Sequence, residues 1–210
     1  MVRGKRIVVI GAGIVGASLA YHLAGKGANV TVVDAGDVAS GVTATSFAWI
    51  NTTHNAPDPI ASLRSAAIRE YHRLEQELPS VKIRWTGALC YGTNTQPAMA
   101  LRVNRKRIRE LEPQLKKPPE HAQFKAEEGA LDAVHTTLAL ITGAQAHGAK
   151  LLTHTRVLGF KTQGSQVTGV ETRLGVINAD VVALAAGTGT PALTKLLGFP
   201  LPIDASPAIF

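Results

Sequence analysis

The stretch that most constrains the fold lies near the start of the chain. Residues 7–10 form a β-branched run of the kind found in a strand that is buried on both faces. Residues 11–16, which contain three glycines, are expected to open a helix that continues to about Gly25. Residues 30–33 predict a second strand. A strand, a helix and a strand in this order need a right-handed crossover, so the segment predicts a parallel sheet.

Three glycines and one acid give this segment a chemical meaning. Gly11 permits a tight turn out of the strand, Gly13 lets the backbone approach a pyrophosphate, and Gly16 lets the helix pack against the strand. The free N–H groups of the helix N-terminus then point at the phosphates. Asp34 ends the second strand, where a carboxylate accepts hydrogen bonds from a ribose diol and disfavours a 2′-phosphate. The pattern predicts a dinucleotide site that disfavours NADP and leaves NAD and FAD open.

The chain is basic, with a formal charge of +7. Much of this charge falls in residues 101–109, where aromatic or groove-reading partners for nucleic acid are missing. We expect a solvated helix there, with Leu101, Ile108 and Leu111 turned inward, and we expect no nucleic-acid partner. The net charge favours an anionic substrate or a negatively charged partner chain.

Cysteine and histidine usage argues against a metal site and against disulfides. Cys90 is the only cysteine, and it is expected to pack as a small apolar group in a strand over residues 88–91. The seven histidines have no metal-ligand spacing, so no metal is expected.

No apolar stretch is long enough for a transmembrane helix, which needs about eighteen residues or more. Arg3, Lys5 and Arg6 precede an apolar run and so imitate a signal peptide, but glycines with a better explanation interrupt that run. We expect a cytoplasmic protein.

The rest of the chain alternates between helix and strand patterns. Helices are expected over residues 59–78 and 136–147 and in a last segment that ends near Gly198. Strands are expected over residues 81–85, 88–91, 123–126, 150–157, 167–173, 175–178 and 181–184, with 167–178 forming a hairpin. Residues 40–55 are small and polar and are expected to form a loop. A doubly wound α/β pattern therefore appears twice, with a sheet-like insert between.

Two further segments are GVTATSFA (41–48), a loop of small residues, and RELEP (109–113). The first is similar to the small-residue loop and the second to the recurring E-L-E-P segment of the D-amino-acid oxidase-like flavoproteins, which include glycine oxidase, sarcosine oxidase and related amine dehydrogenases. Later segments follow in the family's order: EGALD (128–132), HGA (147–149), TRVLGF (155–160), VTGVET (167–172) and ADVVALAAG (179–187). The resemblance covers essentially the whole chain.

The resemblance implies bound FAD. It places the backbone of Val157 against the adenine and returns the turn at residues 185–187 to the cofactor. The expected cofactor-binding residues are Gly11, Ala12, Gly13, Ile14, Val15, Gly16, Asp34, Ala35, Thr43, Ala44, Thr45, Ser46, Ala48, Val157, Ala186 and Gly187.

Three departures from the family pattern stand out. Asp34 occupies a position where the family usually has Glu, and Ala133 stands where a proline is common. Some members attach their flavin through a histidine in the early loop or through a later cysteine. This chain has no histidine in that loop and Cys90 does not match the later position, so we expect non-covalent FAD.

The family plan also predicts the domain organisation. The fold class is α/β: a doubly wound Rossmann-type FAD-binding domain with an inserted α+β substrate-domain segment, incomplete at the C-terminus. Residues 1–82 and 129–198 are expected to form the discontinuous FAD-binding domain, and residues 83–128 and 199–210 part of a substrate-binding domain. A fragment, a proenzyme cut in two and a split enzyme completed by a second polypeptide each fit this plan.

The function implied is the oxidation of the C–N bond of an amino acid or amine by hydride transfer to flavin. No catalytic residue is identified, since His54, Trp49 and Tyr91 are better explained by packing than by a place near the substrate. A non-catalytic, cofactor-holding subunit of a heteromeric flavoenzyme is the first alternative. An NAD-dependent dehydrogenase is the second, but residues 83–128 take up the length that a nicotinamide-binding half needs.

Overall fold

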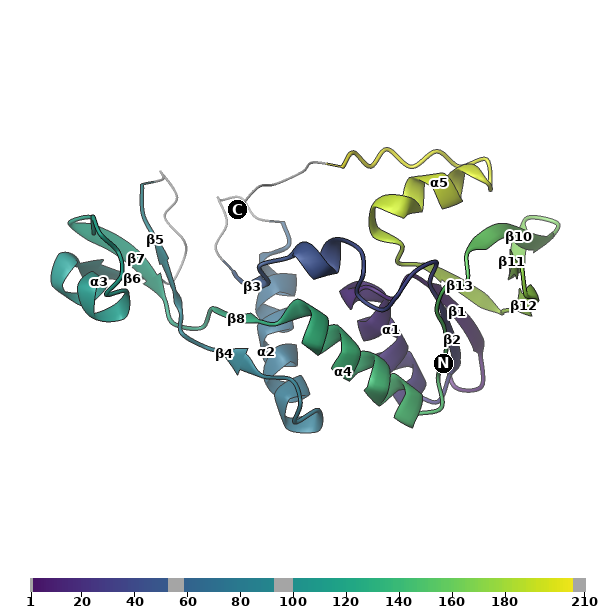
Figure 1. Cartoon of the computed structure of the whole chain (residues 1–210), viewed down its shortest axis with the longest axis horizontal. Helices are drawn as coiled ribbons and strands as arrows, with labels where there is room; N and C mark the ends of the chain where they lie inside the picture. The colour runs from purple at the N-terminus through teal and green to yellow at the C-terminus, as the bar shows by residue number, and fades with distance from the viewer. Residues whose placement is uncertain (1, 53–58, 93–99, 206–210) are drawn as a thin grey trace. The chain divides into compact units, whose positions relative to one another are not determined.

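The computed structural model describes residues 2–52, 59–92 and 100–205 (Figure 1). Packing divides the chain into two compact units. Unit 1 comprises Met1–Ser46 and Ala133–Phe210, and unit 2 comprises Phe47–Asp132. The chain therefore leaves unit 1 once and returns to it. The functional boundaries expected at residues 82, 129 and 198 stay a prediction, because packing units and ligand-binding domains need not coincide.

A parallel sheet forms the centre of unit 1. Its strands are β13 (Val181–Leu184), β1 (Arg6–Ile10), β2 (Asn29–Val33) and β9 (Lys150–Leu152), in that spatial order. Each neighbouring pair is parallel. The helix α1 (Ile14–Gly25) connects β1 to β2, which confirms the strand–helix–strand prediction. The α/β class with a parallel sheet is likewise confirmed.

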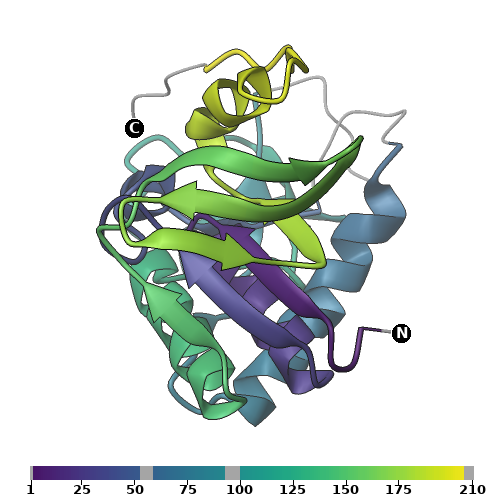
Figure 2. The same cartoon turned by 90° about the vertical axis from the view of Figure 1, so that its right-hand side faces the viewer.

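Two different layers cover this sheet, as Figure 2 shows. The helices α1 and α4 (Ala133–Ala146) pack together on one face. The other face carries an antiparallel sheet of β10 (Val157–Gln163), β11 (Gln166–Thr172) and β12 (Gly175–Asn178). The apolar core between the two sheets contains Val8, Ile10, Val33, Val157, Val170 and Ala179. Alternate residues of β1 thus face opposite layers, as a buried strand requires.

The last described helices of unit 1 come after β13 in the chain. A short 3-10 helix, η2 (Gly187–Gly189), leads into α5 (Thr190–Lys195). Within residues 2–52, 59–92 and 100–205, no helix combines the length and apolar character that a membrane span requires.

In its described residues, unit 2 contains two small antiparallel sheets and two helices. One sheet has the order β3 (Trp49–Ile50), β8 (Gly129–Leu131), β4 (Ile83–Arg84), and the other β5 (Ala88–Cys90), β7 (His121–Lys125), β6 (Leu101–Asn104). The helices are α2 (Ala61–Glu77) and α3 (Arg105–Leu111). Val103, Ile108 and Ala122 form a small apolar cluster beneath α3.

The expected helix over residues 101–109 is wrong in its first half. Residues 101–104 form strand β6, paired with β7, and the Leu101 side chain is exposed rather than turned inward. The helix starts only after Asn104, whose side-chain oxygen accepts a hydrogen bond from the backbone N–H of Arg107 (3.0 Å). Such a cap fixes the helix start. Ile108 is buried as expected.

Two further predictions need correction. The expected loop over residues 40–55 contains a 3-10 helix, η1 (Val42–Thr45), and strand β3. The expected strand over residues 150–157 is two strands, because β9 ends at Leu152 and β10 begins at Val157. His154 lies between them with φ +51°, a left-handed conformation that interrupts any strand.

Candidate cofactor-binding site

The carboxyl edge of the parallel sheet brings the main sequence motifs of unit 1 together. The glycine loop follows β1, Asp34 follows β2, and the Ala185–Gly187 turn follows β13. Ligands of open α/β sheets bind outside this edge, at the point where the strand order reverses. Strand β1 is such a point, because the chain continues to β2 on one side while β13 pairs on the other.

Two glycines allow the close packing at this edge. Gly11 has φ +112°, and a Cβ there would overlap the backbone carbonyl of Ala185. A Cβ on Gly16 would overlap the carbonyl oxygen of Gly11. The N-terminal turn of α1 therefore lies directly against the end of β1, and both positions exclude every side chain.

The N-terminus of α1 has the donors that a pyrophosphate requires. Gly13 is the N-cap residue in extended conformation, and it supplies no side-chain cap. The first helical N–H, that of Ile14, donates to the hydroxyl oxygen of Thr43 (3.1 Å), while the side chain of Val15 is exposed. Because the Thr43 hydroxyl accepts from the helix, its own proton is directed elsewhere and can be donated to an anion. The donor set fits a phosphate group.

Asp34 has a structural role that sequence reasoning missed. Its Oδ2 accepts a hydrogen bond from the N–H of Ala12 (2.6 Å), and its Oδ1 accepts one from the N–H of Gly36 (2.8 Å). The carboxylate therefore ties the glycine loop to the end of β2. Each oxygen keeps a further lone pair, so the ribose contact expected from the sequence is compatible with both bonds. Ala35 is exposed beside it.

The small-residue loop contributes unequally to this site. Thr43 contacts the α1 N-terminus, whereas Thr45 donates its hydroxyl proton to the carbonyl of Val42 (3.1 Å). Ala44 and Ser46 are exposed, and η1 packs against α4. The remaining predicted loop residue, Ala48, belongs to unit 2, where it has φ +51°.

Val157 and the Ala185–Gly187 turn also lie at this edge of unit 1, but they differ in whether the side chain or the backbone is exposed. Val157 starts β10 with its side chain in the core, so only its backbone can face a ligand. Ala185 donates its N–H to the carbonyl of Ile10 (2.8 Å), which anchors the turn, and Ala186 packs partly against the core. Gly187 is exposed, with φ +54°.

The segment that precedes β10 also runs beside Asp34, which no local signal in the sequence indicated. The N–H of Thr155 donates to the Asp34 carbonyl (2.7 Å), and that of His154 donates to the Gly36 carbonyl (3.2 Å). The His154 Nε2 atom lies 3.0 Å from the Asp37 Oδ1 atom, with both side chains largely exposed. Only the pairing of β2 with β9 brings these residues together.

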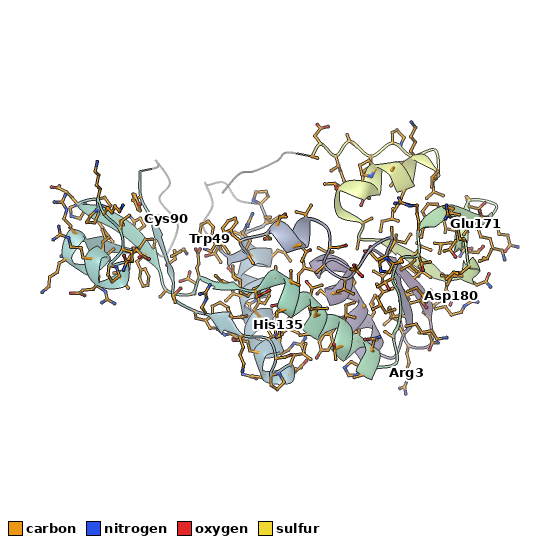
Figure 3. The ribbon with its side chains drawn as sticks, viewed as in Figure 1. Arg3, Trp49, Cys90, His135, Glu171 and Asp180 are labelled. Atoms are coloured by element: carbon orange, nitrogen blue, oxygen red, sulfur yellow. The ribbon has the colours of Figure 1, made fainter. Side chains whose placement is uncertain are left out.

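The residues suggested near a substrate lie in unit 2 or outside the described chain. Trp49 is on β3, with its indole N–H bonded to Glu128 (3.1 Å), and Tyr91 is exposed. Cys90 is half-buried on β5 and is not part of a disulfide (Figure 3). His54 lies outside the described residues. In the described part of the chain, no group of three or more metal-ligating side chains is arranged to hold an ion.

Comparison with known proteins identifies the family. The profile of the family described as FAD dependent oxidoreductase (DAO) matches residues 6–208. The chain belongs to this FAD-dependent oxidoreductase family. That range includes both units and every cofactor-binding residue expected from the sequence.

Similar proteins include amine-oxidising enzymes. The chain is 28% identical over 218 residues to 4-methylaminobutanoate oxidase (formaldehyde-forming) of Paenarthrobacter nicotinovorans, covering 96% of this chain and 26% of that protein. It is 26% identical over 225 residues to sarcosine oxidase subunit beta of Arthrobacter sp, covering 96% and 55%. The crystal structure of L-proline dehydrogenase from P. horikoshii superposes with a TM-score of 0.84 at 25% identity, covering 95% and 57%. The chain thus spans about a quarter to somewhat over half the length of these relatives.

Proposed function

We propose that the carboxyl edge of β1, β2 and β13 binds FAD without a covalent link, and that the protein oxidises the C–N bond of an amino acid or amine. The observation that carries the proposal is the N-terminus of α1, to which the N-cap residue Gly13 supplies no side chain and beside which Thr43 and Asp34 lie. The names of the relatives support the substrate class. Bound FAD supplies the acceptor for the hydride that leaves the substrate carbon.

The chain's own residues have separate tasks in this proposal. The N–H groups at the start of α1 and the hydroxyl of Thr43 hold the pyrophosphate. Asp34 holds the glycine loop in shape and accepts from the ribose. The backbone at Val157 and the Ala186–Gly187 turn complete the cofactor contacts. The division into FAD-binding and substrate-binding domains expected from the sequence is part of the same proposal.

Anaerobic mixing tests the activity. The FAD-loaded protein is mixed with a panel of amino acids and secondary amines, and the long-wavelength flavin absorbance is followed. Bleaching by one class of amine supports the proposal and names its substrate, whereas a flavin that no amine reduces contradicts the oxidase activity of this chain.

Acid precipitation distinguishes covalent from non-covalent attachment of the flavin, since non-covalent flavin stays in the supernatant.

A cofactor-holding subunit is the second candidate. It is favoured by the similarity to sarcosine oxidase subunit beta, a protein named as one subunit of an enzyme. This candidate predicts a yellow protein that no amine bleaches until a second polypeptide is added. Native mass spectrometry of the purified material then shows a partner of comparable size, and a lone 22.1 kDa species contradicts it.

A cytoplasmic location also belongs to the proposal. It is supported by the apolar run after Arg6, which resembles a signal peptide in sequence but forms β1 and α1 of the fold. Fractionation of expressing cells tests it, and recovery of the protein outside the cytoplasmic fraction contradicts it.

A further inference from the structure

Glu128 is a fully buried carboxylate (0% exposed) outside the contacts of the glycine loop. It lies in the turn between β7 and β8 of unit 2. Its Oε1 accepts hydrogen bonds from the backbone N–H of Thr52 (2.7 Å) and from the Thr52 hydroxyl (3.1 Å), and its Oε2 accepts one from Trp49 Nε1 (3.1 Å). A buried charge is unfavourable unless such donors converge on it. The carboxylate therefore fixes both ends of the segment 49–52.

The residue just before this segment has an unusual backbone. Ala48 adopts φ +51°, although it has a Cβ, and its carbonyl accepts from the N–H of Leu131 (3.3 Å). A non-glycine residue keeps such a conformation only where the surrounding structure imposes it, and such residues gather at ligand-binding sites. Ala48 is also the last residue of the small-residue loop (41–48), two residues beyond Ser46, where the first segment of unit 1 ends.

We propose that Glu128 is a positioning residue for the flavin cofactor. Through Trp49 and Thr52, its carboxylate holds Ala48 in the left-handed conformation and so fixes the exit of the cofactor-binding loop. The inference rests on the proposed function, because Ala48 contacts a cofactor only in a chain that binds FAD. Glu128 itself touches neither cofactor nor substrate in this proposal.

Unit 2 offers a matched control. Glu75 on α2 accepts a hydrogen bond from a tryptophan indole, that of Trp85 (2.7 Å), and from a backbone N–H, that of Ile83 (3.0 Å). It thus makes the same two kinds of bond as Glu128, but it holds α2 to β4 rather than the segment after the cofactor loop. A variant of Glu75 reports what a general loss of stability in unit 2 does to FAD binding.

The experiment compares Glu128→Gln with Glu75→Gln in the full 210-residue chain. FAD affinity, the visible circular dichroism of the bound flavin, and hydrogen exchange of segment 47–52 without FAD are measured for each. Glutamine has an NH2 group in place of one carboxylate oxygen. This group faces one of the N–H or O–H donors from which Glu128 accepts, so that hydrogen bond is lost. We expect Glu128→Gln to weaken FAD binding roughly tenfold, change the flavin dichroism and accelerate exchange. Glu75→Gln should leave affinity and dichroism at the parent values.

The contrary outcomes are distinct. Parent-like affinity and dichroism in Glu128→Gln overturn the inference and leave the proposed function standing, as does an equal loss of affinity in both variants. A parent chain that binds no FAD overturns the proposed function and the inference with it. If Glu128→Gln does not fold, Trp49→Phe removes the indole donor while keeping an aromatic ring at this position. It should weaken FAD binding by about threefold with the same change in dichroism, and parent-like values overturn the inference.

Discussion

Each of the two units is stabilised internally by a different kind of contact. Unit 1 has a continuous apolar layer between its two sheets, centred on residues such as Val8, Val33 and Val170. Unit 2 has a small apolar cluster under α3, and glutamate side chains join its separate pieces. A buried aliphatic side chain contributes about 1.5–3 kcal/mol wherever it packs, whereas a buried carboxylate stabilises only if all its donors are present.

This difference bears on how each unit handles a ligand. The edge of unit 1 that we propose binds the cofactor consists of backbone groups at the ends of strands whose positions the apolar core already fixes. In unit 2, the segment after the cofactor loop depends on one carboxylate 76 and 79 positions away in the sequence. Cofactor binding should therefore be most sensitive to backbone packing in unit 1 and to individual polar side chains in unit 2.

The largest effect is expected for Gly16→Ala in unit 1. A Cβ at this position overlaps the Gly11 carbonyl, so the backbone of the glycine loop must move. We expect a loss of about 3 kcal/mol in the free energy of unfolding, measured by urea denaturation, and loss of FAD binding. The control is Gly25→Ala in the same helix, where the added Cβ makes an ordinary 3.6 Å contact with His147. This variant should match or slightly exceed parent stability. Equal behaviour of the two variants would remove the claim of close packing.

Asp34→Asn should have the next largest effect. The amide cannot accept both N–H groups of Ala12 and Gly36 as the carboxylate does. Hydrogen bonds to a charged group contribute about 1.5–3 kcal/mol. We therefore expect FAD affinity, measured by calorimetry, to fall by at least about tenfold. Asp37→Asn, three residues on and exposed, serves as the control and should change affinity little. An Asp34→Asn protein with parent affinity would contradict the role given to this carboxylate.

In unit 2, Glu75→Gln should reduce stability by about 1–2 kcal/mol, because one of its two donors loses its acceptor. Thermal unfolding measures this change. Glu77→Gln, which removes one exposed ion pair with Arg73 on the same helix, should cost no more than about 0.5 kcal/mol. If both substitutions cost equally little, polar contacts do not hold unit 2 together.

The smallest effect concerns acid stability at the edge of unit 1. Hydrogen bonds from the Arg6 side chain and backbone lower the pKa of Asp180, which Figure 3 labels, from 3.8 to about 2. Because the folded-state pKa is the lower one, this stabilisation is present above pH 3.8 and is lost as the pH falls to about 2. Stability of the parent should fall more steeply than that of Asp180→Asn over this range, as measured by urea unfolding. Parallel curves would show that the pair is unimportant for acid stability.

The sequence predicted the parts of the fold that local patterns determine. The β-branched run of β1, the glycines before α1 and the acid after β2 lie within one short stretch, and each has a single structural explanation. The break between β9 and β10 was missed because the left-handed conformation of His154 arises from its contact with the end of β2. The same reasoning failed for residues 101–104, where pairing with β7 outweighs a helical charge pattern.

The candidate site likewise has features that local sequence patterns predicted and features that they did not. Gly11 and Gly16 were predicted with their reasons, whereas the internal bonds of Asp34 were not, since they depend on the shape of the loop. Glu128 begins the family-like segment EGALD, but nothing in the sequence indicated its hydrogen bonds, because its donors Trp49 and Thr52 are distant in the sequence. Local motifs predict which backbone groups bind a cofactor, and only the folded chain shows which side chains hold that backbone in place.

The central claim is that the carboxyl edge of the parallel sheet in unit 1 binds FAD, and calorimetric titration of the cofactor-free chain tests it most directly. Titrations with FAD and with NAD are run on the parent and on Gly16→Ala. We predict saturable binding of one FAD per parent chain, no saturable binding of NAD, and no FAD binding by Gly16→Ala. A parent chain that binds no FAD, or that binds NAD more tightly than FAD, would contradict the account.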